Sequence, residues 1–528
     1  GGSASRSTGS DVDRILELTG TYTGALGDHN VTLLGGYSYQ DFLSESFNAW
    51  NTRFPTDQFD WNQLNQGDGI REGQGGVGSG KSSYKLVGFF GRLNYDWQNR
   101  FLLMASLRYE GNSRFGAGHK WGLFPAISAG WRLTEESFIQ SLPFINDLKL
   151  RAGYGVTGTA PNSSYLSLTS YQYGARFFYN GRWVPGLFPA RNPNPDLRWE
   201  EKHELNVGLN FALFDSRLNG AVDVYRRETR DLLYNYSVPV PPYLTSSFLG
   251  NVGNMRNTGV ELELSYDVIR RPGFVWTTSV NGSTNSNKLV SLSSDTFQPQ
   301  SDCFNTGYTG EPIQTSTHRV CVGWPIGNFW GWKSVDIDDN GEWIVLDSLG
   351  QRIPVSQATE RDKRVLGNGL PKYYFAWNNT AQIGNFDVTV NLRGAAGFQI
   401  LNFTRMFYEN PQILQYNMLK SAFDPVYGKR PVKYPLTYVS YYIEDGDYLK
   451  IDNVAVGYTL PRTGVLGALL PNTVSNARIY VAGQNLYTFT GYKGIDPEVS
   501  TAGLDPGIDH RDKYPTVRRF SAGITVSF

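Results

Sequence analysis

Apolar residues alternate with small or polar residues along much of this chain, which is the pattern of β-strands with two unlike faces. The last segment, 520–528, is the clearest example. One face would carry Phe520, Ala522, Ile524, Val526 and Phe528, and the other only Ser, Gly and Thr. Such a strand suits the C-terminal strand of a soluble β-sandwich, or a barrel whose outside meets lipid and whose inside meets water or a plug.

Charges on the polar face favour the barrel. Glu261 and Glu263 alternate with Val and Leu residues in one stretch, and Asp387 and Arg393 do so in another. A dry soluble core does not accept such charges unpaired, whereas a watery lumen does. These lumen residues could tune selectivity, hydrogen-bond to one another or contact a plug.

The alternation predicts about 15 strands. They would cover residues 11–24, 29–45, 82–97, 100–113, 120–134, 147–158, 197–213, 217–234, 255–269, 273–288, 371–383, 385–398, 447–460, 475–489 and 514–528. Short turns and long connections alternate between these strands. The long connections lie at about 46–81, 159–196, 235–254, 289–370, 399–446 and 490–513. Short periplasmic turns and long extracellular loops are typical of an outer-membrane barrel.

We therefore predict an all-β fold, in which residues 1–528 form one portion of a transmembrane antiparallel β-barrel in the bacterial outer membrane, with extracellular loops. Single-chain barrels of this kind have even strand numbers. An odd count that begins and ends with a downward strand implies an odd number of further strands before Gly1.

Composition and charge agree with this prediction. The chain has 58 Gly, 32 Tyr, 30 Phe and 13 Trp, and aromatic enrichment suits the girdles of a membrane barrel, although aromatics also fill soluble β cores. Its 48 basic and 48 acidic residues balance, which gives no attraction to nucleic acid. The sequence contains no apolar run long enough for a transmembrane helix.

The two cysteines, Cys303 and Cys321, lie in one irregular stretch. In an exported protein such a pair predicts a disulfide, which would stabilise the fold by about 3 kcal/mol in the chain-entropy model. Two unpaired thiols are the alternative. His318 lies between them and makes a metal site conceivable, but this ligand set lacks a repeating spacing.

One segment resembles a calcium-binding loop. Its oxygen-bearing residues are Asp336, Asp338, Asn340, Glu342 and Asp347, with a Gly at position 6. This spacing suits a hard cation, so a structural Ca²⁺ is predicted here, and no other cofactor is required. Position 12 is Asp rather than the bidentate Glu, and no flanking helices are evident. An Asx-rich hairpin turn at Asn340 is the alternative.

Several tryptophans fall in or beside the predicted long loops: Trp50, Trp61, Trp183, Trp324, Trp330 and Trp332. Aromatic faces stack on sugar rings and grip peptide side chains, so these residues are candidate ligand contacts. They could equally anchor the protein at the membrane interface or pack the loops together. The five His residues are scattered at wide spacing and no catalytic constellation is evident, so we expect no enzyme activity.

A series of short motifs runs in order from about residue 80 to the end. They are Gly91–Tyr95 (GRLNY), Ser106–Phe115 (SLRYEGNSRF), Trp121–Pro125 (WGLFP), Trp131–Phe138 (WRLTEESF), Leu148–Gly155 (LKLRAGYG), Leu197–Glu200 (LRWE), Asn257–Leu262 (NTGVEL), Gly367–Pro371 (GNGLP), Gly483–Phe489 (GQNLYTF) and Tyr514–Phe520 (YPTVRRF). Together they resemble the C-terminal half of SusC/RagA-like TonB-dependent transporters of the Bacteroidetes outer membrane. The terminal aromatic strand, with Phe520, Ile524, Val526 and Phe528, also resembles the signal for outer-membrane barrel assembly.

The resemblance implies a barrel of about 22 strands with a plug, of which the present strands would be about numbers 8 to 22. It implies import of oligosaccharides or peptides, with a SusD-like lipoprotein as the lid and with energy from TonB. The plug and the TonB contact are not recognisable in residues 1–528, so a plug-bearing N-terminal segment or polypeptide would supply them. Outer-membrane lipid would surround the barrel, and two transporter–lid units would often pair as a dimer.

A barrel that serves in attachment or assembly without transport is the main alternative, and a loop-borne surface enzyme is a distant third. A plug with a TonB box would favour import over the structural role. The identity of the substrate is left open, because glycan and peptide importers of this family share the same barrel motifs.

Overall fold

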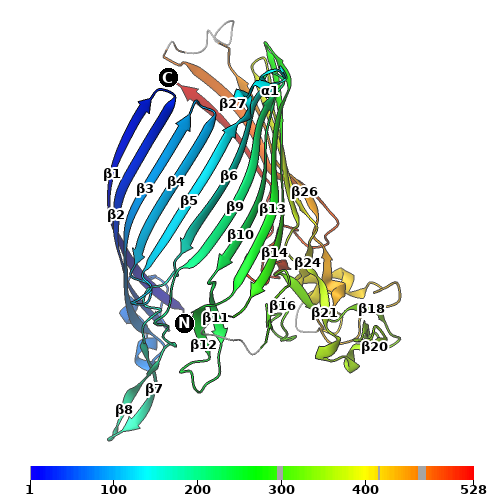
Figure 1. Ribbon diagram of the computed structural model, residues 1–528. Helices are drawn as coiled ribbons and strands as arrows, with labels where there is room; N and C mark the ends of the chain where they lie inside the picture. The colour runs from blue at the N-terminus through cyan, green and yellow to red at the C-terminus, as the bar shows by residue number, and fades with distance from the viewer. Residues whose placement is uncertain (1, 294–300, 414–416, 462–470, 472) are drawn as a thin grey trace. The chain divides into compact units, whose positions relative to one another are not determined.

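The computed structural model describes residues 2–293, 301–413, 417–461, 471 and 473–528. Within them, 15 antiparallel strands form one sheet in the order β1-β2-β3-β4-β5-β6-β9-β10-β13-β14-β22-β23-β26-β27-β29 (Figure 1). Their bounds are β1 Ser3–Leu26, β2 His29–Thr52, β3 Gly76–Trp97, β4 Phe101–Asn112, β5 Trp121–Arg132, β6 Ile145–Thr159, β9 Glu200–Leu213, β10 Leu218–Arg230, β13 Asn254–Arg271, β14 Phe274–Ser291, β22 Tyr373–Ile383, β23 Phe386–Ala396, β26 Tyr448–Thr459, β27 Asn476–Thr490 and β29 Arg519–Ser527. The predicted all-β fold and its strand count are confirmed.

The strands differ from the prediction mainly at their ends. β1 begins at Ser3 instead of residue 11, and β3 begins at Gly76 instead of residue 82. Both extensions are rich in Gly and Ser, so they lack the apolar alternation on which the prediction depended, yet their backbones pair with β2. β29 begins later than predicted, at Arg519.

The chain divides into two compact units. The first comprises Gly1–Gly130, Gly153–Glu204 and Thr229–Gly253. The second comprises Trp131–Ala152, Leu205–Glu228 and Asn254–Phe528.

The register of the second unit separates the two faces of the sheet. One row of directly paired residues runs Glu263, Asn281, Ala376, Arg393 and Lys450, from β13 to β26. Paired residues point to the same face, so this row is polar. The neighbouring row on the opposite face runs Leu262, Gly282, Phe375, Gly394 and Leu449 and is apolar. This difference between faces is what a barrel wall between lipid and water requires.

The long connections of the first unit contain two small hairpins. β7 (Tyr171–Tyr179) pairs with β8 (Arg182–Pro189), and β11 (Leu233–Ser237) pairs with β12 (Ser247–Asn251). The unit also has the 3₁₀ helices η1 (Leu64–Gln66) and η2 (Gly69–Glu72). A small core of Phe115, Phe124, Val156, Leu197 and Trp199 lies beneath these connections.

The connections of the second unit contain three small sheets and most of the helices. The strands are β15 Cys303–Thr306, β16 His318–Cys321, β17 Asn328–Gly331 and β21 Arg364–Asn368; β18 Ser334–Ile337, β19 Trp343–Leu346 and β20 Arg352–Pro354; and β24 Gln399–Asn402, β25 Ile443–Asp445 and β28 Ile508–Asp509. The helices are α1 Ser137–Gln140, α2 Phe403–Tyr408, η3 Leu133–Glu135, η4 Val355–Gln357, η5 Glu360–Asp362, η6 Lys420–Phe423 and η7 Ser440–Tyr442. Across the described parts of the chain, the helices are all too short or too polar to cross a membrane.

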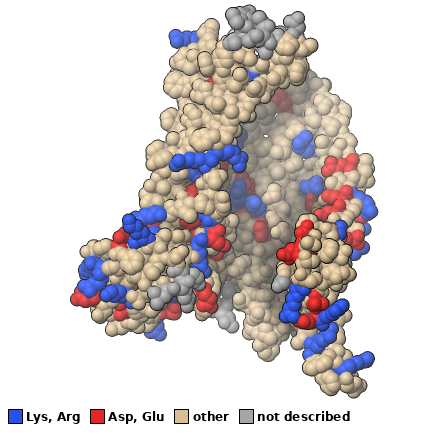
Figure 2. Space-filling view, turned by 180° about the vertical axis from the view of Figure 1, so that it is seen from behind, with Lys and Arg blue, Asp and Glu red and all other residues tan. Residues whose placement is uncertain are grey.

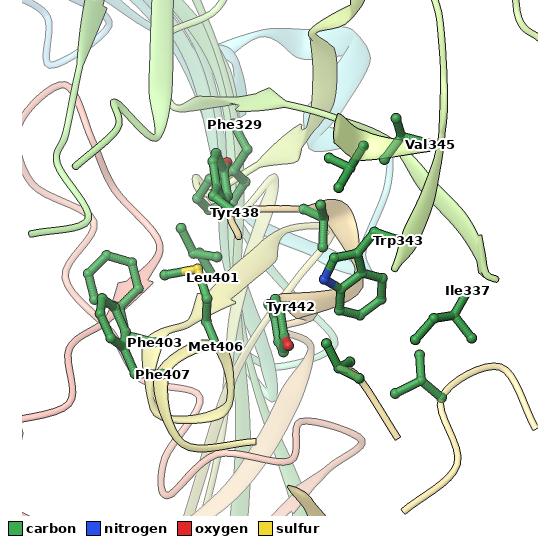
Figure 3. Packing of buried hydrophobic residues seen from close by; sticks show 14 of the residues in the cluster. Phe329, Ile337, Trp343, Val345, Leu401, Phe403, Met406, Phe407, Tyr438 and Tyr442 are labelled. Atoms are coloured by element: carbon green, nitrogen blue, oxygen red, sulfur yellow. The ribbon is translucent and has the colours of Figure 1, made fainter. Parts of the chain in front are cut away.

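The largest hydrophobic core lies among these connections rather than on the sheet. Phe329, Trp343, Met406, Phe407 and Tyr442 are each at most 2% exposed and pack together (Figure 3). They come from β17, β19, α2 and η7, which are far apart in the sequence. We call this the connection core. Burial of this many large apolar side chains makes the long connections a folded layer of their own.

Candidate functional site

A cleft of about 570 Å³ lies on the polar face of the second unit. Side chains from β10, β13, β14, β22, β23 and β26 line it, together with Glu498 from the connection between β27 and β29. Figure 2 shows acidic and basic side chains together on the hollowed face of the sheet. The volume is in the range of small-molecule sites, so this cleft is the candidate binding site.

The basic end of the cleft is built on β23 and β26. Arg393 donates from Nε to Asp452 over 2.9 Å, and its two terminal nitrogens bind the carboxylate of Glu498. Lys450 Nζ donates to Glu498 over 2.9 Å and to Asp496 over 3.2 Å. The Lys450 side chain is only 1% exposed. A buried ammonium ion requires such partners, because an unpaired charge in this position would be strongly destabilising.

A β-bulge supplies one of these partners. Asn391 of β23 pairs with Asn453 of β26, but the next residue, Leu392, pairs with Ile451. Asp452 is therefore the extra residue of β26 and has no partner in this ladder. Bulges re-aim side chains, and here the bulge places the Asp452 carboxylate beside Arg393.

Ion pairing keeps the two carboxyl groups of the β27–β29 connection ionised. Burial raises the pKa of Glu498, but the bonds from Arg393 and Lys450 outweigh burial and bring the pKa down to about 2. Burial likewise opposes ionisation of Asp496, whose pKa is nevertheless lowered by bonds from Thr516, from the Glu498 backbone and from Lys450. Both groups are thus anionic at neutral pH.

At the acidic end of the cleft, fewer of the carboxylates are paired with a cation. Asp223 binds Arg151, which also donates to Asn210 over 2.7 Å and to Asn206 over 3.2 Å. In contrast, Glu261 and Glu263 are exposed and form no ion pair with any residue that the structure describes. Three aromatic residues, Tyr374, Phe375 and Tyr448, lie in the same lining. The cleft thus combines both signs of charge with aromatic surface.

The residues of the predicted calcium loop serve in turns and ion pairs. Asp336 binds Arg352 and Lys429, the latter over 2.8 Å. Asp338 accepts backbone N–H groups of the turn at Asn340 and Glu342, and Asp347 does the same for the following turn, at Leu349 and Gln351. Among the described residues, three or more His, Cys, Asp or Glu side chains nowhere gather as a metal site. Calcium binding at this loop stays a prediction.

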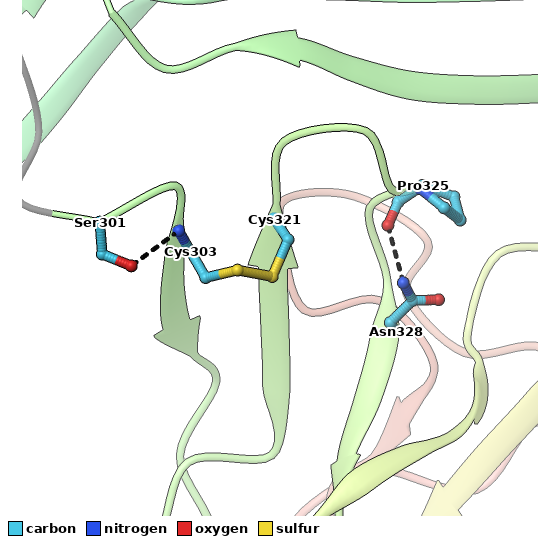
Figure 4. Close-up of a disulfide and its surroundings, with 5 residues drawn as sticks. All are labelled: Ser301, Cys303, Cys321, Pro325 and Asn328. Atoms are coloured by element: carbon cyan, nitrogen blue, oxygen red, sulfur yellow. Dashed lines mark hydrogen bonds between the residues drawn. A yellow bond between two sulfur atoms is a disulfide. The ribbon is translucent and has the colours of Figure 1, made fainter.

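The two cysteines lie opposite each other on β15 and β16 and are joined by a disulfide (Figure 4). Beside it, Cys303 N donates to Ser301 Oγ over 3.1 Å. His318 is not directed to the sulfurs. Its Nδ1 is 2.8 Å from Thr317 Oγ1 and its Nε2 is 2.9 Å from the Pro506 carbonyl oxygen. Because both sulfurs are used in the bond, they are not available as metal ligands here.

The predicted tryptophans divide between the two units. In the second unit, the rings of Trp324 and Trp330 are tilted to each other with their centroids 6.2 Å apart, Arg319 lies over Trp330, and Lys363 lies over Trp332. These three rings pack within the connections. In the first unit the tryptophan side chains are exposed to solvent. They are Trp50 on β2, Trp61, and Trp183 on β8. A ligand contact by any of them stays a prediction.

The β7–β8 hairpin exposes an unusual amount of aromatic surface. It forms a two-stranded sheet of its own (Figure 1). Tyr173, Phe178, Tyr179 and Trp183 on it are each at least 60% exposed. An isolated hairpin is marginally stable in water, and exposed apolar patches mark interaction sites. Apart from Trp183, the sequence analysis did not single out these residues.

The C-terminal strand pairs with β27, and Phe520, Ile524, Val526 and Phe528 are exposed. An apolar, exposed outer face agrees with lipid contact. Its role as an assembly signal stays a prediction.

Alternation in the sequence predicts Arg393 on the polar face, whereas Lys450, Asp452, Asp496 and Glu498 are not predicted from it. One feature of the sequence could have indicated this site: Arg393 and Lys450 both fall on the polar face of predicted strands. The register that sets them opposite each other, and the bulge at Asp452, could not be seen in the sequence.

Comparisons with known proteins identify the family. The model of the family described as "TonB dependent receptor-like, beta-barrel" matches residues 2–408. TonB-dependent receptor P3 of Formosa agariphila is 31% identical over 100% of this chain and 53% of its own length. TonB-dependent receptor SusC of Bacteroides thetaiotaomicron is 28% identical over 84% of this chain and 44% of its own length.

The fold has a solved counterpart. A chain in the structure of the RagAB peptide transporter superposes with a TM-score of 0.86 at 23% identity, over 99% of this chain and 56% of that chain. The present chain spans about half the length of the curated relatives it matches. The chain belongs to the TonB-dependent receptor-like β-barrel family.

Proposed function

We propose that this chain forms the larger part of the barrel wall of an outer-membrane importer for oligosaccharides or peptides. The observation that carries the proposal is the ligand-sized cleft on the polar face, between Glu261 and Glu263 on one side and Arg393 on the other. TonB-dependent receptors are outer-membrane proteins, so the apolar face would meet lipid and the polar face the lumen. We place the long connections on the extracellular side.

The remaining parts of the importer would lie outside these residues. A plug-bearing N-terminal segment or polypeptide would fill the lumen and carry the contact with TonB. The strands described here would then be about numbers 8 to 22 of the complete barrel. Pulling on the plug would open a path past the cleft, which supplies hydrogen-bonding and aromatic groups for either ligand class.

Uptake by whole cells tests the proposal. Cells that produce the complete transporter should take up a labelled oligosaccharide or peptide from a panel, and cells without TonB should lose that uptake while they still bind the ligand. The same cells with the transporter gene deleted serve as the control. Binding without TonB-dependent uptake of any panel member would contradict import and favour a binding or structural role.

We also propose that a SusD-like lipoprotein docks on the β7–β8 hairpin. Phe178 and Trp183 are 62% and 65% exposed and contact each other edge to face, with ring centroids 5.6 Å apart. Aromatic residues of this kind form the central contacts of protein interfaces. The hairpin also carries Arg176 and Arg182 and no acidic residue, so the lid should present an apolar surface with an acidic rim.

Co-purification tests this interface. Combined Phe178→Ser and Trp183→Ser substitutions should reduce the lipoprotein that co-purifies in mild detergent by roughly tenfold or more, since each lost aromatic contact costs about 1–2 kcal/mol. Leu349→Ser, at an apolar residue of the second unit that is 82% exposed, should leave the yield of lipoprotein unchanged. Mass measurement of the intact complex would also show whether two transporter–lid units pair. An unchanged yield from the double variant would contradict docking at the hairpin.

A further inference from the structure

Arg393 lines the basic end of the cleft, the buried Lys450 lies beside it, and Glu498 is the carboxylate that binds both cations. Arg393 and Lys450 are directly opposite in the register of β23 and β26. Like charges in this arrangement repel each other and destabilise the pairing of strands. The Glu498 carboxylate bridges them, because its Oε1 and Oε2 accept from Arg393 and its Oε2 also accepts from Lys450.

Of the three carboxylates around these cations, Glu498 is the one that a ligand can replace. Asp496 is 5% exposed and is also held by Thr516 and by the backbone N–H of Glu498, so it keeps its place beside Lys450. Asp452 is fixed by the bulge of a sheet strand. Glu498 is 40% exposed, lines the cleft and belongs to a connection rather than to the sheet.

The backbone beside Glu498 is held without the help of its side chain. Lys513 Nζ donates to the carbonyl oxygens of residues 496 and 498, over 3.2 and 2.8 Å. The backbone N–H of Glu498 donates to Asp496 Oδ1 over 2.9 Å, and Thr516 also binds that carboxylate. The Glu498 side chain can therefore rotate away by rotamer change alone, while the connection keeps its place.

We propose that Arg393 and Lys450 form a carboxylate-binding site, that Glu498 occupies this site when no ligand is bound, and that a single carboxylate of an incoming ligand takes the place of Glu498. The exchange conserves charge at the two cations, because one carboxylate replaces another. The inference rests on the proposed function only in taking the cleft to lie on the path of a ligand.

The rest of the cleft limits the class of ligand. Glu261 and Glu263 line the same cleft and form no ion pair within the described residues, so a polyanion would be repelled. The site therefore fits a ligand with one carboxylate at its end. The carboxyl terminus of a short peptide and the acid group of a uronic sugar share this chemistry.

Calorimetric titration of the complete transporter in detergent tests the site. One pair of probes is an N-acetylated tripeptide with a free or an amidated carboxyl terminus, and the other is a disaccharide that ends in glucuronic acid or in glucose. Wild-type protein should prefer the acid in at least one pair. Glu498→Gln removes the competing charge and should tighten binding of that acid by about tenfold, the value of one charge-assisted hydrogen bond.

Two further variants separate the site from the general charge of the lumen. Arg393→Gln should weaken binding of the same acid by about tenfold or more. Arg478→Gln is the matched control, because Arg478 binds Asp387 on β23 and is not part of the cleft lining. It should leave the affinity unchanged.

Equal binding of acid and neutral probes in both pairs, or an unchanged affinity of Glu498→Gln for the acid, would overturn the proposal. The pair in which the acid is preferred identifies the source of the carboxylate. Binding in detergent needs neither TonB nor the lid, so a negative titration would leave import standing. Ligand binding by whole cells without any TonB-dependent uptake would instead count against import.

Discussion

At the scale of single residues, burial determines the charge state of His318. Its side chain is fully buried, and its ring lies 4.5 Å from that of Phe329. Burial lowers the pKa of His318 to about 4, although the Pro506 carbonyl oxygen and the charge of Asp505 act in the opposite direction. The imidazole is therefore neutral at pH 7 and links β16 to the connection before β29 through its hydrogen bond to Pro506.

This pKa gives a pH dependence with a definite sign. The unfolded segment, with an ordinary His pKa of about 6.5, binds the proton more readily than the folded one, so local stability falls as pH drops from about 6.5 to 4. The full effect is about 3 kcal/mol of local stability. Hydrogen exchange of the amides of β16 and β17 should accelerate over this range, after correction for intrinsic rates.

His318→Gln removes the titrating group and should flatten that dependence. If wild-type and variant proteins showed the same pH dependence of exchange in β16 and β17, His318 would not be its source.

At the scale of elements, the connections of the second unit fold as a layer with its own core. Met406 is completely buried between Phe329, Phe407 and other members of the connection core (Figure 3). Asn402 caps the N-terminus of α2, because its side-chain oxygen accepts the backbone N–H of Arg405. Arg405 in turn binds Glu409 and Glu444, so the one buried cation of α2 is paired on both sides.

Truncation in this core should loosen the connections without disturbing the sheet. Met406→Ala should cost about 2–5 kcal/mol, the usual effect of a large cavity. Limited proteolysis should then cut the connections between β17 and β25 earlier than in the wild type, while the sheet strands stay protected. Phe423→Ala is the matched control, since Phe423 belongs to the same connection and is 62% exposed. Equal cleavage rates for the two variants would contradict a separate connection core.

At the scale of the whole molecule, period-two alternation is enough to predict the sheet but not the site. The alternation predicts the number of strands and places Glu261, Glu263, Asp387 and Arg393 on the polar face. A local pattern is enough for this, because each strand has its own apolar face whatever its neighbours are. The bridge from Glu498 to Arg393 spans 105 residues of sequence, and no local pattern contains it. The calcium motif is a local pattern that fits two structures. The same spacing of Asp and Asn residues that suits a calcium loop also forms the turns that the structure contains.

The connection core has a consequence for how such a protein changes over generations. Because the connection layer packs around its own core, mutations on its outside should disturb the sheet strands little. In the proposed extracellular position, the connection layer would be the part of the protein that bacteriophages and antibodies meet first, and a surface that can change independently of the sheet would be an advantage against both. Natural variation should therefore be concentrated on the outside of the connection layer, with the buried side chains of that layer and the sheet beneath changing more slowly.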